Sequence, residues 1–402
     1  MKKKSVLIIG NYPPPFGGVP RHIEYLVPYL VEKGWNVHVL SGGNSGIEYK
    51  NGFSVYKPNR LSKVYNLIKT FCRINKKCSF DFKSIRRKHP RKWLRYMIYI
   101  SFGREIIEKE HIAIISAYNL YSYAPIGAVL SDEYNIPLVV TNFGEIYSMN
   151  NFVKNNSDLI KYICKIAKKL LAMSYHCAQS YKLLGLAPDV EVIPYGVDVE
   201  KFSSNKDGSK IRYKLGINAS DKAVLFVGRL IKDMGLHTLL ESIPKVLQTK
   251  EEIKFIIVGQ KGELLPIALQ LAEKYKHSVF VMPNVPFGEL PSYYAASTIV
   301  VAPTQGERAC GSLAAIEAMA TGKPVIASSV GGVPEIVIDR KIGLLISPED
   351  PDALRSAILS LLQDETAIDK MGMIGRKRVE EFYDNNKTNQ KIELLFRELS
   401  GG

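Results

Sequence analysis

Residues 299–327 read IVVAPTQGERACGSLAAIEAMATGKPVIA, and this stretch decides the fold. The apolar run Ile299–Ala302 predicts a buried strand. A polar loop follows, and an alanine-rich helix begins near Gly311 and stops at Gly322, because glycine commonly ends a helix. The apolar run Val325–Ala327 predicts the next strand. Strand, helix and strand in this order make a βαβ unit, which predicts a parallel sheet.

The same alternation extends over nearly the whole chain. In the first half the predicted strands are Val6–Ile9, Val37–Leu40, Ile112–Ser116, Leu138–Thr141, Leu170–Met173 and Val190–Ile193. In the second half they are Val224–Val227, Phe255–Val258, Val279–Met282, Ile299–Ala302, Val325–Ala327 and Gly343–Ile346. The alternation pauses at the polar stretch Asp198–Ala219. We therefore predict an α/β protein of two doubly wound parallel-sheet domains, residues 1–200 and 205–385, facing across a cleft with ligands at the carboxyl ends of the strands.

Charge is concentrated in one segment of the chain. The 402 residues carry a net charge of +15, and residues 57–110 hold sixteen Lys or Arg and four Asp or Glu, or +12 of that total. Aromatic residues lie among these cations. That mixture suits an anionic membrane surface, where each basic residue contributes about 1 kcal/mol. Nucleic acid would satisfy the same electrostatics, and a solvated basic loop is the third alternative. No stretch approaches the roughly 18 apolar residues that a membrane span needs.

Three features could carry chemistry. Gly17 and Gly18 lie between the first strand and its helix, where backbone N–H groups can approach an anion, although an ordinary βα turn explains them equally well. Arg229 directly follows a predicted strand, which would place a permanent cation in the cleft to neutralise phosphate; the alternative is a surface arginine. Glu317 lies in the closely packed alanine-rich helix and needs hydroxyl or N–H partners, which a ribose could supply.

A resemblance rests on five phrases that occur in a fixed order: Gly17-Gly18-Val19, Ile193-Pro194-Tyr195-Gly196-Val197-Asp198, Gly228-Arg229-Leu230, Glu317-Ala318-Met319-Ala320 and Gly331-Gly332-Val333-Pro334-Glu335. With them the chain resembles the retaining glycosyltransferases of family 4 from about residue 5 to 390. The resemblance implies the GT-B architecture of two Rossmann-like domains. The second domain would hold the nucleotide-sugar donor, the first would hold the acceptor, and the last helix, about 386–402, would return to the first.

The resemblance also implies roles for individual residues. Gly17 and Gly18 would face the donor phosphate and sugar, Arg229 would bind the diphosphate, and Glu317 would hold the ribose hydroxyls. The backbone at Cys310, Gly311, Ser312 and Leu313 would bind phosphate, and the base would lie near Val285. The departing phosphate oxygen would take the acceptor's proton, so the protein supplies positioning and charge stabilisation. Neither a metal nor a cofactor is expected, and Asp350-Pro351-Asp352 looks like a turn that opens a helix.

Three positions depart from the family pattern. Met234 stands where the family has a phosphate-binding lysine, Ala309 where it has the first of two glutamates, and Phe143 where it has a histidine. Nearby residues offer replacements: Lys232 or Arg308 for the cation, Glu307 for the carboxylate, and Asn142 or Glu145 for contact with the sugar or acceptor.

We therefore predict a glycosyltransferase in which Arg229, Glu307 and Glu317 support catalysis. It would move a sugar from a UDP- or GDP-linked donor to a glycan, lipid-linked or glycoprotein acceptor. We expect a cytoplasmic protein, with residues 57–110 at the inner membrane face and no nucleic-acid partner. The alternative is a catalytically silent partner of another transferase that binds a sugar nucleotide. A sugar-nucleotide epimerase is less favoured, because those enzymes lack the Glu-Ala-Met-Ala phrase.

Overall fold

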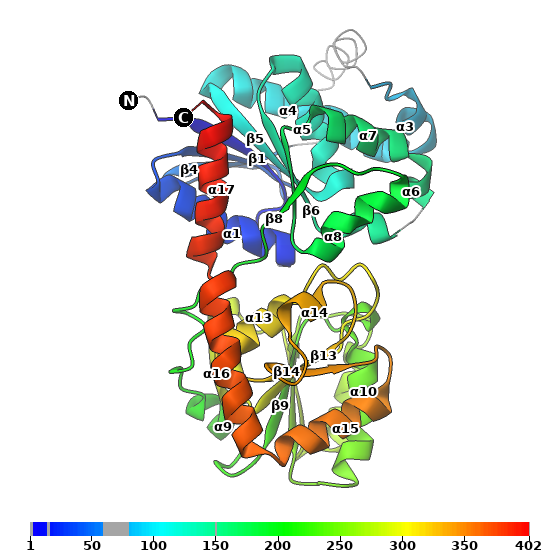
Figure 1. Cartoon of the computed structure of the whole chain (residues 1–402), viewed down its shortest axis with the longest axis vertical. Coiled ribbons are helices and arrows are strands. Elements are labelled where there is room, and N and C mark those ends of the chain that lie inside the picture. Colours follow the sequence, from blue (N-terminus) through cyan, green and yellow to red (C-terminus); the bar gives the residue numbers. More distant parts are fainter. Residues whose placement is uncertain (1–2, 14–16, 59–79, 149–150, 402) are drawn as a thin grey trace. The chain divides into compact units, whose positions relative to one another are not determined.

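The computed structural model describes residues 3–13, 17–58, 80–148 and 151–401. The chain divides into two compact units, one of residues 1–195 and 386–402 and the other of residues 196–385 (Figure 1). Each unit contains one sheet. The strand order is β3-β4-β2-β1-β5-β6-β7-β8 in the first and β11-β10-β9-β12-β13-β14 in the second. The predicted α/β class with two parallel sheets is therefore confirmed.

The first sheet is parallel except for one edge hairpin. Its strands are β1 (Ser5–Ile9), β2 (Asn36–Leu40), β3 (Gly46–Lys50), β4 (Phe53–Lys57), β5 (Ile112–Tyr118), β6 (Leu138–Asn142), β7 (Lys169–Ala172) and β8 (Val190–Val192). Strands β3 and β4 pair antiparallel around Asn51-Gly52. This hairpin was not predicted from the sequence, because β3 leaves Ile47 and Tyr49 exposed, although Asn-Gly is a strong hairpin signal.

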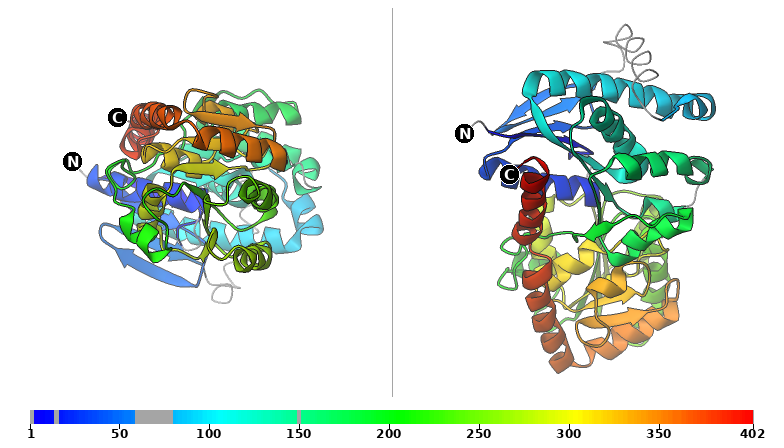
Figure 2. Two further views of the ribbon diagram at one scale, coloured as in Figure 1. Left: turned by 90° about the horizontal axis from the view of Figure 1, so that it is seen from below. Right: turned by 45° about the horizontal axis from the view of Figure 1, so that its top comes forward.

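Alternate residues of β1 enter two different cores. Val6 and Ile8 pack on the face covered by α1 (Gly18–Glu32) and α17 (Asn385–Leu399). Leu7 and Ile9 pack on the opposite face with α4 (Pro90–Glu110), α5 (Ala124–Tyr134) and α7 (Ser157–Ile166). Figure 2 shows the ribbon of the chain from two further directions. The remaining helices of this unit are α3 (Lys83–Lys88), η1 (Asn119–Tyr123), η2 (Glu145–Ser148), α6 (Asn151–Asn155), α8 (Tyr175–Gln179) and η3 (Ser180–Leu184).

Helix α17 joins the first unit although it ends the chain. The indole N–H of Trp35 donates to Glu393 Oε1 at 3.0 Å, and the Asn389 side chain donates to the carbonyl of Tyr25 in α1 at 3.2 Å. Phe396 is fully buried in the same core. The helix therefore completes the core that α1 begins.

The second sheet is parallel throughout. Its strands are β9 (Ala223–Val227), β10 (Lys254–Gly259), β11 (Val279–Pro283), β12 (Ile299–Ala302), β13 (Val325–Ser328) and β14 (Gly343–Ile346). Its helices are α9 (Ser209–Lys214), η4 (Lys232–Met234), α10 (Leu236–Leu247), α11 (Leu265–Lys274), η5 (Phe287–Glu289), α12 (Leu290–Ala296), α13 (Leu313–Ala320), α14 (Val333–Ile336), α15 (Pro351–Leu362) and α16 (Glu365–Phe382).

The predicted turn at Asp350-Pro351-Asp352 is confirmed. The Asp350 side chain caps α15 by accepting hydrogen bonds from the N–H groups of Asp352 and Ala353. Among the described residues, no helix is both long and apolar enough to cross a bilayer.

Candidate functional site

The loops at the carboxyl edge of the second sheet are joined by backbone hydrogen bonds. In sheet order, the N–H of Asn284 donates to Gly259 O at 2.7 Å, Leu230 to Gln260 O at 2.9 Å, Gln305 to Asp233 O at 3.0 Å, and Gly332 to Ala309 O at 2.7 Å. These bonds connect the loops after β11, β10, β9, β12 and β13 into one continuous layer. The functional residues predicted in these loops are therefore held along a single edge.

Two glycines allow these loops to approach closely. Gly235 has φ +73°, and a Cβ there would lie 1.6 Å from the carbonyl oxygen of Pro303. Gly331 has φ +54°, and its Cβ would lie 2.1 Å from the carbonyl oxygen of Ala309. A side chain at either position would collide with backbone and occupy a conformation that favours glycine. The close approach to Ala309 and the positive φ thus explain why glycine occupies position 331, the first of the Gly-Gly-Val-Pro-Glu phrase.

The loop after β9 carries two cations. Arg229 is exposed, and its guanidinium makes no hydrogen bond or ion pair with any described residue. Lys232 is also exposed, and its backbone N–H is fixed by Glu263 Oε1 at 2.9 Å. Met234 packs against the apolar core of the unit. The position of the family's lysine is therefore occupied by the apolar Met234, while Arg229 and Lys232 supply positive charge in the same loop.

The loop after β12 leads into the N-terminus of α13. Ser312 is the N-cap, and its Oγ accepts a hydrogen bond from the N–H of Ala315 at 3.2 Å. The first-turn N–H groups of Leu313 and Ala314 have no intrahelical acceptor, and the helix dipole adds positive potential there. Glu307 and Arg308 are exposed in this loop, and Cys310 is buried. An anion of the ligand would find backbone donors at this helix end.

Glu317 lies in the middle of α13 and is 4% exposed. The hydroxyl of Tyr294, a fully buried residue of α12, donates a hydrogen bond to Glu317 Oε2 at 2.7 Å. Burial and the negative charge of Glu317 raise the pKa of Tyr294 well above its ordinary value, so this hydroxyl stays protonated as a donor. Tyr294 could not be predicted from the sequence, because no motif connects it with Glu317.

Val285 lies between β11 and η5 and is half-buried. The preceding residue, Asn284, has φ +58° and holds the loop against Gly259 through the hydrogen bond described above. Val285 is thus separated from α13 by the loops after β10 and β9. The sheet order spreads the predicted base, diphosphate and ribose contacts along the edge instead of stacking them at one point.

In the first unit, the predicted glycine turn opens α1. Gly17 is the N-cap and has an extended backbone. A Cβ at Gly18 would lie 2.9 Å from the hydroxyl oxygen of Tyr195, which follows β8. The turn therefore lies at the carboxyl edge of the first sheet.

Phe143, at the family's histidine position, belongs to an aromatic cluster. Its ring centroid lies 5.9 Å from that of Tyr195, 6.1 Å from that of Tyr118 and 6.4 Å from that of His22. Burial lowers the pKa of His22 to about 4, so its imidazole is neutral at pH 7. The cluster joins residues at or just after the carboxyl ends of β5, β6 and β8 to His22 near the start of α1.

The two acceptor-side candidates differ in accessibility. Asn142 is fully buried: its amide nitrogen donates to Cys177 O at 3.1 Å and to Ser180 Oγ at 3.0 Å, and its oxygen accepts from the N–H of Gly144 at 2.8 Å. These bonds occupy the amide in holding the loop after β6. Glu145 is half-buried and accepts from the N–H of Phe143 at 2.9 Å. Glu145 is therefore the better placed of the two to meet a ligand.

Within residues 3–13, 17–58, 80–148 and 151–401, no group of three or more His, Cys, Asp or Glu side chains could hold a metal ion.

Two family models match consecutive parts of the chain. The model described as Glycosyltransferase Family 4 matches residues 16–201, and the model described as Glycosyl transferases group 1 matches residues 207–378. An uncharacterized glycosyltransferase of Methanocaldococcus jannaschii is 25% identical over 98% of this chain and 99% of its own length. The D-inositol 3-phosphate glycosyltransferase of Segniliparus rotundus is 32% identical over 46% of this chain and 42% of its own.

A further relative is named for both its donor and its acceptor. This is the GDP-mannose-dependent alpha-(1-6)-phosphatidylinositol monomannoside mannosyltransferase of Mycolicibacterium smegmatis, which is 26% identical over 56% of this chain and 58% of its own. Among solved structures, sucrose-phosphate synthase of Thermosynechococcus elongatus has a TM-score of 0.80 at 21% identity, over 99% of both chains. HepE of Anabaena in complex with UDP has a TM-score of 0.73 at 18% identity, over 98% of this chain and 100% of its own. These likenesses confirm the predicted fold of two Rossmann-like domains.

Proposed function

The chain belongs to glycosyltransferase family 4, and we propose that it moves a sugar from a nucleotide-sugar donor to its acceptor with retention of configuration and without a metal. The observation that carries the proposal is the hydrogen-bonded loop layer of the second unit. It holds the loop of the exposed Arg229 and the loop that leads to the N-terminus of α13 along one sheet edge, and the buried carboxylate of Glu317 follows within α13. Parallel α/β sheets bind nucleotides at this edge.

Each of these groups suits one part of a nucleotide diphosphate. Arg229 offers a planar guanidinium for phosphate oxygens. The backbone from Cys310 to Leu313 offers N–H donors and the positive end of α13. The Glu317 carboxylate would accept from ribose hydroxyls, and Val285 would line the base. By the family resemblance, Gly17 and Gly18 would contact the donor through their backbone N–H groups.

The proposed reaction uses no protein nucleophile. The departing phosphate oxygen would take the proton of the acceptor hydroxyl, while cations and backbone dipoles stabilise the charge that develops on the diphosphate. Arg229 would supply this stabilisation with help from Lys232, since Met234 is apolar. Glu307, exposed in the loop after β12, would contact the sugar where Ala309 replaces the family's first glutamate.

We propose a UDP- or GDP-linked donor and a glycan, lipid-linked or glycoprotein acceptor at the cytoplasmic membrane face. UDP is bound in the HepE structure, and the M. smegmatis relative is named for GDP-mannose and a phosphatidylinositol mannoside. Helix α3 and the start of α4 expose Lys83, Arg86, Arg87, Lys88 and Arg91, and Leu94 beside them is 43% exposed. Basic residues around an apolar side chain favour an anionic membrane. Residues 59–79 of the predicted membrane segment lie outside the described residues.

A thermal-shift screen against UDP, GDP, ADP, CMP and their sugar conjugates tests the donor site. A nucleotide present at 100 times its Kd stabilises the folded protein by about 2.7 kcal/mol, which raises the Tm of a unit of this size by roughly 5–10 °C. Arg229→Gln should weaken nucleoside diphosphate binding about 10- to 100-fold and leave nucleoside binding unchanged. Lys250→Gln, an exposed cation at the opposite edge of the sheet, is the matched control.

The second candidate is a silent partner that binds the nucleotide sugar without transfer. The apolar Met234 and Ala309 favour it. The assay that separates the two functions uses the nucleotide sugar that raises the Tm in the screen. It measures the release of free nucleotide from that compound with and without candidate acceptors. Binding without any release supports the silent partner, and a panel with no shift contradicts both candidates.

A further inference from the structure

One face of α4 carries basic side chains that have no acidic partner. Lys92, Arg95 and Tyr99 follow one another at spacings of three and four, so they share a face of the helix. His89, the N-cap, lies one turn before Lys92. None of His89, Lys92 and Arg95 makes an ion pair with any carboxylate in the described residues. Charged side chains are normally paired where they are buried, and here three half-buried basic side chains share a face without such a partner among the described residues.

Arg95 is held between two tyrosines. The carbon at the centre of its guanidinium lies 5.6 Å from the ring centroid of Tyr99 and 5.0 Å from that of Tyr123. Its Nη2 donates to the carbonyl of Ser122 at 3.4 Å, which is a long bond. Its Nε is buried and has no hydrogen-bond acceptor within the part of the chain that the structure describes. The rings orient the guanidinium, and much of its donor capacity is unused.

Lys92 lies beside Arg95 in the same situation. Its Nζ is 3.3 Å from the ring centroid of Phe152 in α6. Burial, together with the charge of Arg95, lowers the pKa of Lys92 to about 8. Nε2 of His89 is buried without an acceptor among the described residues, and burial and Lys92 lower the pKa of His89. Each group would gain from an anion placed between them.

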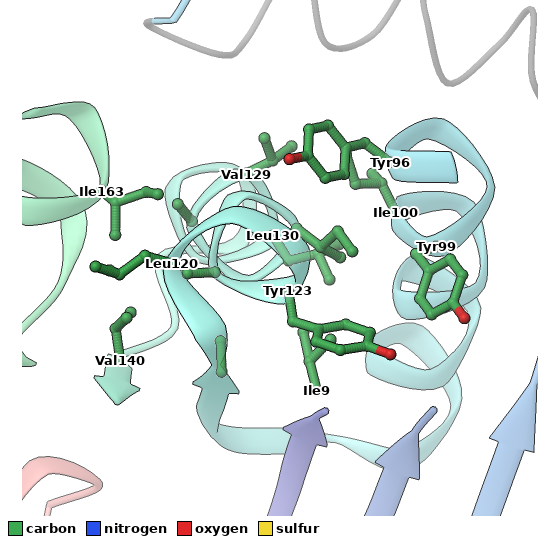
Figure 3. Packing of buried hydrophobic residues seen from close by; sticks show 14 of the residues in the cluster. Ile9, Tyr96, Tyr99, Ile100, Leu120, Tyr123, Val129, Leu130, Val140 and Ile163 are labelled. Carbon is green, nitrogen blue, oxygen red and sulfur yellow. The ribbon is translucent and has the colours of Figure 1, made fainter. Parts of the chain in front are cut away.

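This basic cluster (His89, Lys92 and Arg95) borders the carboxyl edge of the first sheet. The Tyr123 hydroxyl donates to Asn11, which follows β1, and the Tyr99 hydroxyl donates to the carbonyl of Ser41, which follows β2, at 3.3 Å. Figure 3 shows the hydroxyls of Tyr99 and Tyr123 pointing in similar directions from α4 and the η1 segment. The segment η1 is a π-helical turn directly after β5, and such turns are frequent at functional sites.

We propose that Arg95 and Lys92 bind a phosphoryl group of the acceptor substrate. The inference rests on the proposed function, because it assigns the first unit to the acceptor. A guanidinium with unused N–H donors matches the paired oxygens of a phosphoryl group, and an ammonium supplies a second charge. The tyrosine hydroxyls and the Ser41 region provide polar neighbours for the sugar or polyol that carries it. The phosphoryl group can belong to a lipid headgroup or to a soluble phosphorylated acceptor.

Tryptophan fluorescence offers a local probe. The chain has two tryptophans, Trp35 and Trp93, and Trp93 follows Lys92 directly. In a Trp35→Phe background, titration with inorganic phosphate should give a saturable change in Trp93 emission. Arg95→Gln and Lys92→Gln should each weaken phosphate binding about 10- to 100-fold, as expected for one charged hydrogen-bond partner. Lys165→Gln, an exposed cation on α7 of the same unit, should leave it unchanged.

Two further arms identify the source of the phosphoryl group. Vesicles of phosphatidylcholine in which roughly one lipid in five is phosphatidylinositol should compete with phosphate if the acceptor is a lipid. Vesicles of pure phosphatidylcholine are the control and should not compete. Glycerol 3-phosphate should compete without vesicles if the acceptor is soluble. Phosphate binding that survives Arg95→Gln in a variant with parental circular dichroism, or no saturable change in the parent, overturns the inference.

The nucleotide screen separates this inference from the proposed function. A protein that binds nucleotide but gives no Arg95-dependent phosphate response retains the proposed function and refutes the acceptor site. A protein with an Arg95-dependent response and no nucleotide shift refutes the proposed donor site and leaves the phosphate site standing. Lys92→Arg keeps the charge and should restore binding lost in Lys92→Gln.

Discussion

Replacing Tyr294 by phenylalanine removes one hydroxyl from the interior of the second unit. Tyr294 is fully buried, Glu317 is 4% exposed, and the bond between them is 2.7 Å long. A hydrogen bond to a charged group contributes about 1.5–3 kcal/mol, and its loss leaves a buried carboxylate less well solvated. For a unit of this size, 1 kcal/mol corresponds to roughly 2–4 °C in Tm. Tyr294→Phe should therefore lower the Tm by about 3–12 °C.

Glu317→Gln separates the structural role from the binding role. The glutamine keeps an oxygen that can accept from Tyr294, so the loss in Tm should be smaller than for Tyr294→Phe. It removes the negative charge, so charged hydrogen bonds to ribose hydroxyls would be lost. The Kd of the nucleotide that shifts the parent should rise about 10- to 100-fold.

Differential scanning calorimetry and isothermal titration calorimetry on the two variants and the double variant measure both effects. Tyr293→Phe is the control, since Tyr293 is the buried neighbour on α12 and its hydroxyl makes no hydrogen bond with the described residues. Parental nucleotide affinity in Glu317→Gln would refute the ribose role. An unchanged Tm in Tyr294→Phe would refute the claim that the hydrogen bond from Tyr294 to Glu317 stabilises the second unit.

Three further predictions concern single positions. Gly331→Ala forces a Cβ to 2.1 Å from Ala309 O at φ +54°, so calorimetry should show a lower Tm and weaker nucleotide binding, whereas Gly288→Ala, in open space, should show neither. His22 has a pKa of about 4 when folded and about 6.5 when unfolded, so protons favour the unfolded chain below pH 6.5. Urea titrations should show about 3 kcal/mol of stability lost between pH 6.5 and 4, and His22→Phe should flatten that slope; an equal slope would contradict it. Asn142→Ala breaks the buried amide bonds and should destabilise the first unit by about 1–3 kcal/mol while nucleotide affinity stays parental; a parental Tm would show that those bonds contribute little.

Much of the fold could be predicted because buried parallel strands are short apolar runs between helices. Each of the twelve predicted strands overlaps an observed one, and runs such as Ile299–Ala302 match to the residue. The β3–β4 hairpin was missed because its outer strand buries little, so apolar patterning carries no signal there.

The site could be predicted only where a local motif carries it. Gly331 and the N-cap Ser312 can be recognised in the sequence, because a positive φ favours glycine and a helix N-terminus favours serine. The bond from Tyr294 to Glu317 joins residues 23 positions apart, and no spacing rule reveals it. Asn142 was proposed for ligand contact as a replacement for the family's histidine at the position of Phe143. Its amide proves to be occupied by Cys177, Ser180 and Gly144, which depends on how β6, α8 and η3 pack.

The return of α17 to the first unit gives the protein a particular order of assembly during translation. The second unit is inserted between residues 195 and 386 of the first. When residues 1–195 leave the ribosome, the apolar groove beside Trp35 and α1 still lacks Ile392 and Phe396, which are synthesised after the second unit. The later unit can therefore finish folding while the earlier one waits for its final helix. Until then, the exposed groove is a surface that a chaperone would recognise and where premature aggregation would begin.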